Sequence, residues 1–182
     1  MRRAGIKLRT ADQSHVPKLH ALITANLEEG HLLPRTLSEL MVHAERFTIA
    51  VRNRKIVGCA ELAPLSAAVA EVRSLVVDKS ARGGGLGAQI VDELRRRARR
   101  EGFERLCAFT HRHGYFIHMG FSIVPHLWLP EKIFTDCVKC PLFRRCGQYA
   151  MVVPVELARD AAGDSAREAD RGVGATELAR YA

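Results

Sequence analysis

The 182-residue sequence predicts a single α/β domain with a mixed sheet of about six to seven strands and helices on both faces. Apolar segments typical of strands alternate with segments of helical periodicity, in the order strand, helix pair, three strands, helix, strand, helix and final strand. A helix joins the strand at 71–77 to the strand at 105–110, which predicts two parallel strands across a right-handed crossover. With 47% apolar residues, the chain can bury a sizeable core.

The predicted strands are dominated by β-branched and other apolar residues. They are residues 6–10, 47–51, 55–63, 71–77, 105–110 and 149–153. Arg52-Asn53-Arg54 is a candidate hairpin turn between two of them, which should therefore pair antiparallel.

Capping residues and helical spacing indicate two helices in the N-terminal part. Thr10 or Asp12 can cap the first helix, in which apolar residues recur every three or four positions. The second helix is expected from Thr36 or Ser38, with Glu39 placed to support its N-terminus.

A glycine-dense turn joins the strand at 71–77 to a helix expected from about Gly85 to Arg100. Its glycines, which allow left-handed backbone angles and close approach to a ligand, are Gly83, Gly84, Gly85 and Gly87. The helix start presents unpaired N–H groups and the positive end of the helix dipole, so we expect an anion there. The loop has neither the Gly-Lys-Ser/Thr ending of a P-loop nor the acidic residue of a dinucleotide fingerprint.

The C-terminal part contains a short helix, a cysteine-rich segment and a polar tail. The short helix lies within residues 111–121 and should end at Gly120. Three closely spaced cysteines suggest a zinc site, and they are Cys137, Cys140 and Cys146. The fourth ligand would be His126, Asp136 or Cys107. One close pair is incomplete for a structural site, so no metal is predicted, and packed thiols or a redox-sensitive pair are the alternatives. Residues 1–155 should form the domain, and residues 156–182 a helical or disordered tail.

The formal charge of +8 is concentrated in five arginines between residues 95 and 100. A solvated helix end capped by Gly102 is favoured over a nucleic-acid patch, because cations stabilise a helix C-terminus. No signal peptide or membrane-spanning run is visible, so we expect a soluble cytoplasmic protein with no nucleic-acid or membrane partner. The five cysteines should be thiols.

The pattern Arg82-x-x-Gly85-x-Gly87 after a strand resembles the pyrophosphate loop of the GNAT N-acetyltransferases, which bind acetyl-CoA. Three further segments are similar to the bacterial N-acetylglutamate synthases, and they are residues 30–40, 70–77 and 109–121. Residues 129–141, together with Cys146, resemble the short, single-domain synthases in particular. The resemblance spans about residues 5–153. It implies transfer of an acetyl group from acetyl-CoA to the α-amino group of L-glutamate, at the start of arginine biosynthesis.

The resemblance places the general base of the family at Glu71, where a carboxylate can remove the ammonium proton of the acceptor. An ordinary partner for Arg73 is the alternative role for this carboxylate. Backbone N–H groups should polarise the thioester carbonyl and hold the pyrophosphate. The N–H groups that polarise the carbonyl are expected on Leu75, Val76 and Val77. Those that hold the pyrophosphate are expected on Arg82, Gly83, Gly85, Gly87 and Ala88.

Glutamate carries two carboxylates, for which Arg35 and Arg73 are the candidate binding residues. Strand alternation predicts Arg73 on the same face as Glu71 and Leu75. A surface ion pair is the alternative for either arginine.

Many relatives place a tyrosine where this chain has Phe116, so Thr110 is the candidate proton donor to the departing thiolate. Tyr115 should project about a hundred degrees away from that position on a helix, which favours a core or surface role.

Two other functions compete with glutamate acetylation. One is acetylation of another small amine or amino acid, although a cationic polyamine would be repelled by the arginines. The other is a non-catalytic acetyl-CoA sensor that acts on nucleic acid through the arginine-rich helix, and Phe116 supports it. A homodimer is the alternative to a monomer.

Overall fold

The structure is a computed structural model, in which residues 5–29 and 32–155 are described. The strands are β1 (Lys7–Thr10), β2 (Phe47–Arg52), β3 (Lys55–Pro64), β4 (Val69–Val77), β5 (Arg105–Thr110), β6 (Ser122–Val124) and β7 (Tyr149–Pro154). The α-helices are α1 (Val16–Thr24), α2 (Leu37–His43), α3 (Leu86–Arg100), α4 (His113–Ile117) and α5 (Pro130–Thr135). Short 3-10 helices are η1 (Gln13–His15), η2 (Leu27–Glu29), η3 (Ala44–Arg46), η4 (Lys79–Ala81), η5 (His126–Trp128), η6 (Cys137–Lys139) and η7 (Phe143–Arg145). The predicted tail at 156–182, and residues 30–31 of the segment that resembles the synthases, lie outside the described residues.

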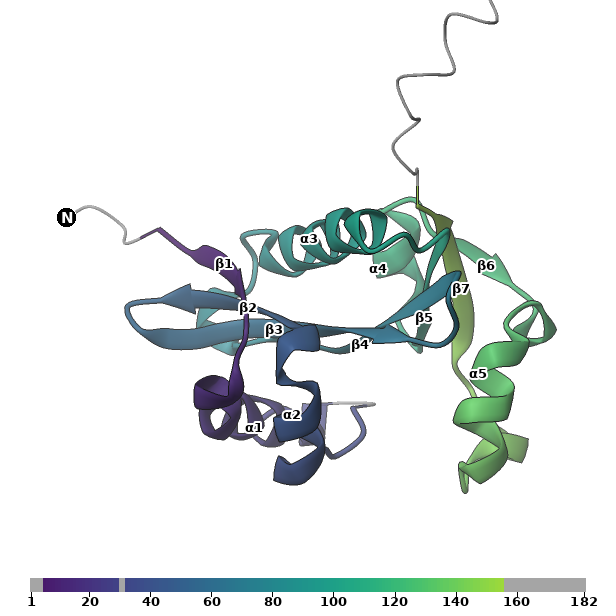
Figure 1. Ribbon diagram of the computed structural model, residues 1–182, viewed down its shortest axis with the longest axis horizontal. Coiled ribbons are helices and arrows are strands. Elements are labelled where there is room, and N and C mark those ends of the chain that lie inside the picture. Colours follow the sequence, from purple (N-terminus) through teal and green to yellow (C-terminus); the bar gives the residue numbers. More distant parts are fainter. Residues whose placement is uncertain (1–4, 30–31, 156–182) are drawn as a thin grey trace, which may run out of the picture.

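The strands form one seven-stranded sheet in the order β1-β2-β3-β4-β5-β7-β6. Neighbours pair antiparallel except β4 and β5, which are parallel across α3. Helices α1 and α2 cover one face, and α3 and α4 cover the other (Figure 1). The predicted mixed sheet with helices on both faces is therefore confirmed, and so is the antiparallel hairpin, where Asn53 and Arg54 adopt positive φ angles.

The first two helices begin at the predicted capping residues. Asp12 accepts a hydrogen bond from Ser14 N–H at 2.8 Å, so Asp12 rather than Thr10 caps the turn that leads into α1. Thr36 and Glu39 form a reciprocal capping box at the start of α2. The capping box of α2 fixes the end of the connection directly after Arg35, and with it the backbone position of Arg35.

Helix α3 has the predicted apolar stripe and a capped C-terminus. The buried stripe is Leu86, Ile90, Val91, Leu94 and Ala98. Gly102 has a φ of 84°, and hydrogen bonds from its N–H and from Phe103 N–H reach back into the last turn, which is a Schellman motif. Arg96 and Arg100 pair with Glu93, as expected of a solvated helix face.

A β-bulge interrupts β4 and corrects the predicted face of Leu75. Opposite β3, Arg73 pairs with Glu61 and Val76 pairs with Cys59, so one extra residue lies in β4. Ser74, within this bulge, has a φ of 49°. As a result Arg73 keeps the face of Glu71, but Leu75 packs with the cluster beneath α3. The prediction that Leu75 shares their face is wrong, because strict alternation does not continue through a bulge.

Candidate active site

Strands β4 and β5 separate after Glu71, a third of the way along β4. Their parallel register runs over Val69, Ala70 and Glu71, and Glu71 lies opposite Cys107. Beyond this pair β4 continues beside β3 as far as Val77. Asp78 N–H donates to a carbonyl of β3, so alternation turns Val77 N–H away from β3, toward the opening. The structure therefore leaves backbone donors of β4 along one side of a gap between parallel strands.

The glycine loop lies at the end of β4 and leads into α3. Gly83 and Gly85 have φ angles of 82° and 72°, which L-residues rarely adopt. A Cβ atom on Gly83, Gly84 or Gly85 would meet no heavy atom within 4 Å. No side chain caps α3, whose first turn includes Ala88. The loop is therefore open, and its N–H groups and helix dipole suit a phosphate.

Arg82 and Tyr115 flank this loop. The Arg82 guanidinium donates to the carbonyl of Val77 at 2.8 Å and to the side-chain oxygen of Asn26 at 2.9 Å, so it joins the loop to the turn that follows α1. The Tyr115 hydroxyl from α4 lies against Gly87, because a Cβ atom there would be only 2.3 Å from it. Burial raises the pKa of Tyr115. The predicted surface or core role of Tyr115 did not anticipate this contact across the gap.

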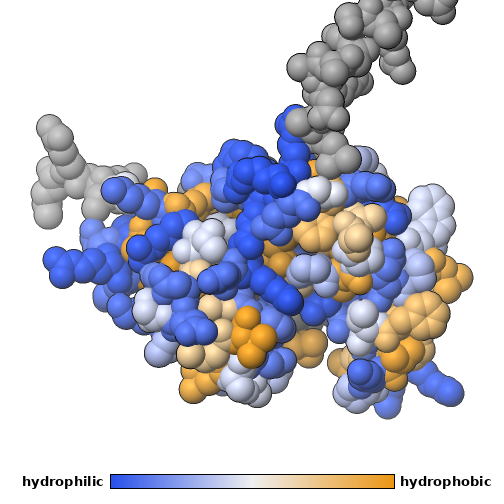
Figure 2. All heavy atoms as spheres, viewed as in Figure 1, coloured by the Kyte–Doolittle hydropathy of each residue, from blue (hydrophilic) through white to orange (hydrophobic). Residues whose placement is uncertain are grey.

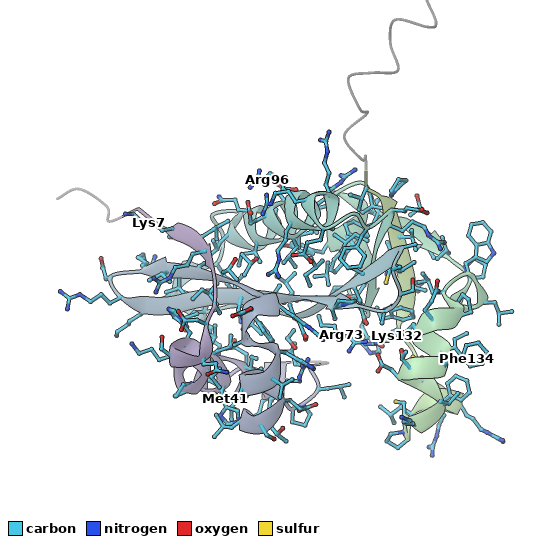
Figure 3. All side chains as sticks on the ribbon, viewed as in Figure 1. Lys7, Met41, Arg73, Arg96, Lys132 and Phe134 are labelled. Carbon is cyan, nitrogen blue, oxygen red and sulfur yellow. The ribbon has the colours of Figure 1, made fainter. Side chains whose placement is uncertain are left out.

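A network of charged side chains lies on the α1 and α2 face, where the strands part. Glu71 is 3% exposed and accepts a hydrogen bond from Arg73 Nε at 2.6 Å. Lys132 Nζ from α5 donates to both of its carboxylate oxygens, at 2.9 and 2.8 Å. Asp136, at the end of α5, pairs with Arg73 and with Lys132. Figure 3 shows Arg73 and Lys132 pointing toward one another between the sheet and α5.

Arg35 reaches the same face from the connection between α1 and α2. It donates to Glu61 at 2.8 Å, and Glu61 is 1% exposed. The Nε atom of Arg35 is buried and makes no hydrogen bond among the described residues, but it lies 3.9 Å from a carboxylate oxygen of Glu39. His43 lies 3.5 Å from Glu61, and desolvation lowers the pKa of His43. Since Glu61 pairs with Arg73 across the strands, the two predicted arginines flank one buried carboxylate.

Thr110 is not brought to the charged network. It ends β5, and its Oγ accepts a hydrogen bond from Arg112 N–H at 2.9 Å. Cys107 and Phe109 belong to the cluster nearest Glu71, so alternation turns Thr110 toward the opposite face. Phe116 is buried edge-on against Phe121 in the core beneath α3.

A notch in the surface bears on access to the site. Figure 2 shows a notch between the lobe formed by α1 and α2 and the lobe formed by α5, with apolar side chains on both. Met41 and Phe134, labelled in Figure 3, belong to these two lobes. The charged network lies between them, so an acceptor can approach from this side.

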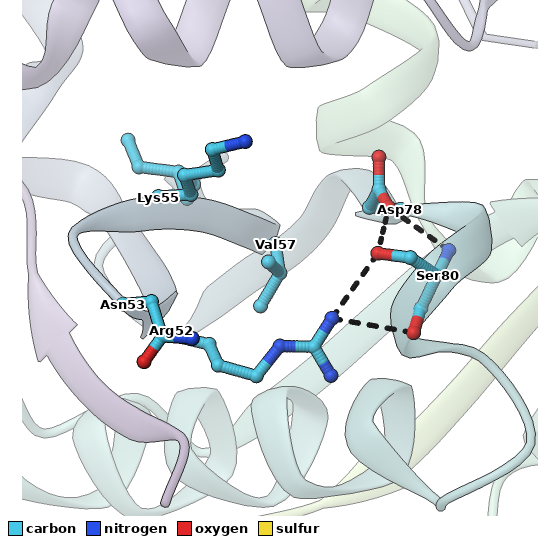
Figure 4. A pocket seen from close by; sticks show the side chains of 7 residues that line it. Arg52, Asn53, Lys55, Val57, Asp78 and Ser80 are labelled. Atoms are coloured by element: carbon cyan, nitrogen blue, oxygen red, sulfur yellow. Dashed lines mark hydrogen bonds between the residues drawn. The ribbon is translucent and has the colours of Figure 1, made fainter. Parts of the chain in front are cut away.

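A separate cavity of about 360 Å³ lies between the β2–β3 hairpin and η4 (Figure 4). There Arg52 donates to Ser80 Oγ at 3.1 Å, and Ser80 N–H donates to Asp78 at 2.9 Å. The hydrogen bonds from Ser80 lower the pKa of Asp78. Asp78 lies seven positions after Glu71 along an extended chain, about 20 Å away. We therefore assign this cavity to the support of the glycine loop and not to the charged network.

The cysteines are all free thiols in the described structure, as predicted. Within the described residues, no group of three or more His, Cys, Asp or Glu side chains could hold a metal ion. In the same part of the chain, no helix has both the length and the apolar character needed to cross a membrane.

The sequence profile described as the acetyltransferase (GNAT) family matches residues 16–121. The chain belongs to this family. An uncharacterized N-acetyltransferase of Chlorobaculum tepidum is 31% identical over 124 residues, which cover 68% of this chain and 80% of that protein. An amino-acid acetyltransferase of Neisseria meningitidis is 32% identical over 130 residues. Those residues cover 70% of this chain but only 30% of that longer relative.

Solved structures agree with this assignment. An N-acetylglutamate synthase from Neisseria gonorrhoeae, complexed with coenzyme A and N-acetyl-glutamate, superposes with a TM-score of 0.75 at 27% identity. It covers 85% of this chain, and this chain spans 36% of it. A Mycobacterium tuberculosis protein complexed with CoA shares the fold, with a TM-score of 0.70 at 24% identity and coverage of 82% and 99%. The predicted GNAT fold, the resemblance to N-acetylglutamate synthases and the acetyl-CoA prediction at the family level are confirmed.

Sequence reasoning missed three members of the charged network. Glu61 is a lone carboxylate within the apolar run of β3, a pattern that signals a buried charge in need of a partner. Lys132 and Asp136 are four residues apart, which places both on one side of a helical turn. No sequence signal indicates that this pair meets β4.

Proposed function

We propose that this protein transfers the acetyl group of acetyl-CoA to the α-amino group of L-glutamate. The observation that carries the proposal is the buried pairing of Glu71 with Arg73, beside the gap between β4 and β5. A carboxylate at this place is suited to take a proton from an amine, and an arginine beside it is suited to bind a carboxylate. The likeness to amino-acid acetyltransferases and to an N-acetylglutamate synthase supports this acceptor.

The open glycine loop fits the pyrophosphate of a coenzyme A thioester, which when bound supplies an activated acetyl group. We assign its phosphates to N–H groups of the loop and of the first turn of α3, at Arg82, Gly83, Gly85, Gly87 and Ala88. Of the predicted donors at residues 75–77, Val77 N–H faces the gap and would hold the carbonyl oxygen where negative charge develops, whereas strand alternation turns Val76 N–H toward β3. This donor at Val77 is fixed by the strand and needs no reorganisation.

Glu71 would accept the proton that the ammonium group of the acceptor must lose before attack. Arg73 and Arg35 would supply guanidinium groups for the two carboxylates of glutamate. Thr110 would donate a proton to the departing thiolate, because its Oγ accepts from Arg112 and its hydroxyl hydrogen can still be given. Tyr115 is a second candidate donor, since its hydroxyl lies across the gap against Gly87.

The test measures coenzyme A release from acetyl-CoA with a panel of L-amino acids, polyamines and short peptides. The assay should not rely on a thiol reagent, because the protein itself contains five cysteines. We expect selective turnover of L-glutamate. Glu71→Gln should lower kcat/KM by about 10²–10⁴-fold near neutral pH, with partial recovery as pH rises and more acceptor amine is neutral. Glu104→Gln, at an exposed carboxylate, is the matched control. An unchanged rate in Glu71→Gln removes Glu71 from the base role.

A further inference from the structure

One side chain of α5 and the side chain directly after this helix occupy the candidate acceptor site. The ammonium group of Lys132 sits on the carboxylate of Glu71, at 2.8 and 2.9 Å from its two oxygens. The carboxylate of Asp136 sits on the guanidinium of Arg73. Lys132 Nζ and Asp136 Oδ2 are themselves 2.8 Å apart. The pair thus presents an adjacent cation and anion to a base and an arginine.

This arrangement has the charge pattern of an amino acid. In a free α-amino acid, the ammonium nitrogen and the carboxylate carbon are both bonded to Cα. The ammonium nitrogen and the nearer carboxylate oxygen are therefore about as close together as Lys132 Nζ and Asp136 Oδ2. An acceptor of this class would place its ammonium group on Glu71 and its carboxylate on Arg73. Those are the two contacts that Lys132 and Asp136 make.

We propose that Glu71 and Arg73 bind the amino-acid headgroup of the acceptor, and that Lys132 and Asp136 are an internal substitute that the acceptor displaces. The inference rests on the proposed function and deepens it, since it defines how the α-ammonium and α-carboxylate groups are recognised. It also makes α5 a determinant of the apparent affinity for the acceptor. Each acceptor must compete with a tethered pair of the same charges.

The attachment of α5 permits this displacement. None of its own residues is buried, and Phe134 is 74% exposed. Leu129, just before it, is fully buried and anchors the N-terminal end of the helix. Withdrawal of Lys132 and Asp136 would therefore break ion pairs while uncovering little apolar surface, and the acceptor replaces those ion pairs with its own.

A purely structural role for Lys132 predicts that its removal destabilises the fold and does not improve binding of the acceptor. Loss of one partner of a buried ion pair leaves an uncompensated charge and destabilises the fold. The variants Lys132→Met and Asp136→Asn separate the two roles, and Asp136→Asn keeps the shape of the side chain if the first variant folds poorly. Lys139→Met removes an exposed positive charge from the same segment and is the matched control.

The experiment measures steady-state kinetics of the full chain with acetyl-CoA and with the amino acid that the wild type uses best. We expect the acceptor KM to fall about ten-fold in Lys132→Met and in Asp136→Asn, the factor expected when an internal competitor is bound nine-tenths of the time. The KM for acetyl-CoA should not change, and Lys139→Met should match the wild type. An acceptor KM that rises or stays constant in both variants overturns the proposal.

The two proposals fail in different ways. If another α-amino acid is the acceptor and its KM falls in the variants, the internal substitute stands and the glutamate assignment falls. If L-glutamate is the acceptor and its KM rises in both variants, the glutamate assignment stands and the internal substitute falls. Butylamine is an amine that lacks a carboxylate. Turnover confined to butylamine, or no turnover with any amine, overturns the proposal that Glu71 and Arg73 bind an amino-acid headgroup.

Discussion

Ser74 holds a left-handed backbone conformation, with a φ of 49°, that residues other than glycine and asparagine seldom adopt. The extra residue at this point separates two sets of side chains. Arg73 stays on the same face as Glu71, whereas Leu75 turns toward α3. The conformation of one residue therefore decides which side chains share the face of Glu71.

Ser74→Val should lower the free energy of unfolding by about 1–2 kcal/mol, because a β-branched side chain is strained in the left-handed region. It should also raise the KM for acetyl-CoA, since the proposed donor at Val77 follows the bulge. Urea denaturation and steady-state kinetics measure the two effects. Ser74→Gly is the control and should be at least as stable as Ser74→Val. Equal stability of wild type and Ser74→Val would contradict a strained bulge.

At the residue scale, the sequence was sufficient to predict several candidate site residues but not all of the side chains that contact them. Glu71 and Arg73 were predicted to share a face, and the structure joins them at 2.6 Å. Leu75 was misplaced, since a bulge within an apolar strand leaves no mark on the residue pattern. Lys132 had no predicted role, because its contact with Glu71 depends on how a distant segment folds back onto β4.

The glycine loop and α3 form the element to which we assign cofactor binding. Gly85 stands at the N-cap of α3 with a φ of 72°, and Gly84 lies beside it without a positive φ. A Cβ atom on either glycine would have open space around it, so only the backbone conformation distinguishes the two positions. This gives a matched pair of substitutions within one loop.

Gly85→Ala should cost about 1 kcal/mol of unfolding free energy and should raise the KM for acetyl-CoA several-fold, because alanine resists the left-handed conformation. Gly84→Ala should change the stability much less. Thermal or urea unfolding and acetyl-CoA titration measure these effects. If the two variants lose the same stability, the left-handed turn is not what Gly85 is needed for.

Elements with strong local signals were predictable. Helices α2 and α3 follow from a capping box and an apolar stripe, and β2 and β3 from a turn between apolar runs. Strand β6 and helix α5 were not predicted, because they are short and contain no buried residue, so they have little hydrophobic periodicity. Tertiary packing rather than local preference decides such segments.

At the scale of the whole molecule, the sheet separates two sets of groups. Helix α3 and the glycine loop lie on one face, and Glu71, Arg73 and Arg35 lie on the other, with the gap between β4 and β5 joining the two sides. The donor and acceptor substrates would then approach from opposite faces and meet at the gap. This division explains why variants on one face should change the KM of one substrate only.

The buried thiols make the stability of the whole fold sensitive to alkaline pH. Burial raises the pKa of Cys59 from 9.0 to about 12, and it also raises the pKa of Cys107. Because these pKa values are higher in the folded state than in the unfolded state, the folded state retains protons that the unfolded state loses. Their stabilising contribution is complete below about pH 9 and is lost as pH rises toward the folded-state values.

Each such thiol should lower the free energy of unfolding by about 1 kcal/mol per pH unit above pH 9. Cys59→Ala removes one of the two contributions, so its stability should fall less steeply with pH than that of the wild type, even if its stability at neutral pH is lower. Cys146→Ala, at an exposed thiol, should follow the wild-type slope. Urea unfolding at several pH values between about 8 and 10.5 measures the three slopes. Equal slopes in all three proteins would show that Cys59 is not a protonated, buried thiol in the folded state.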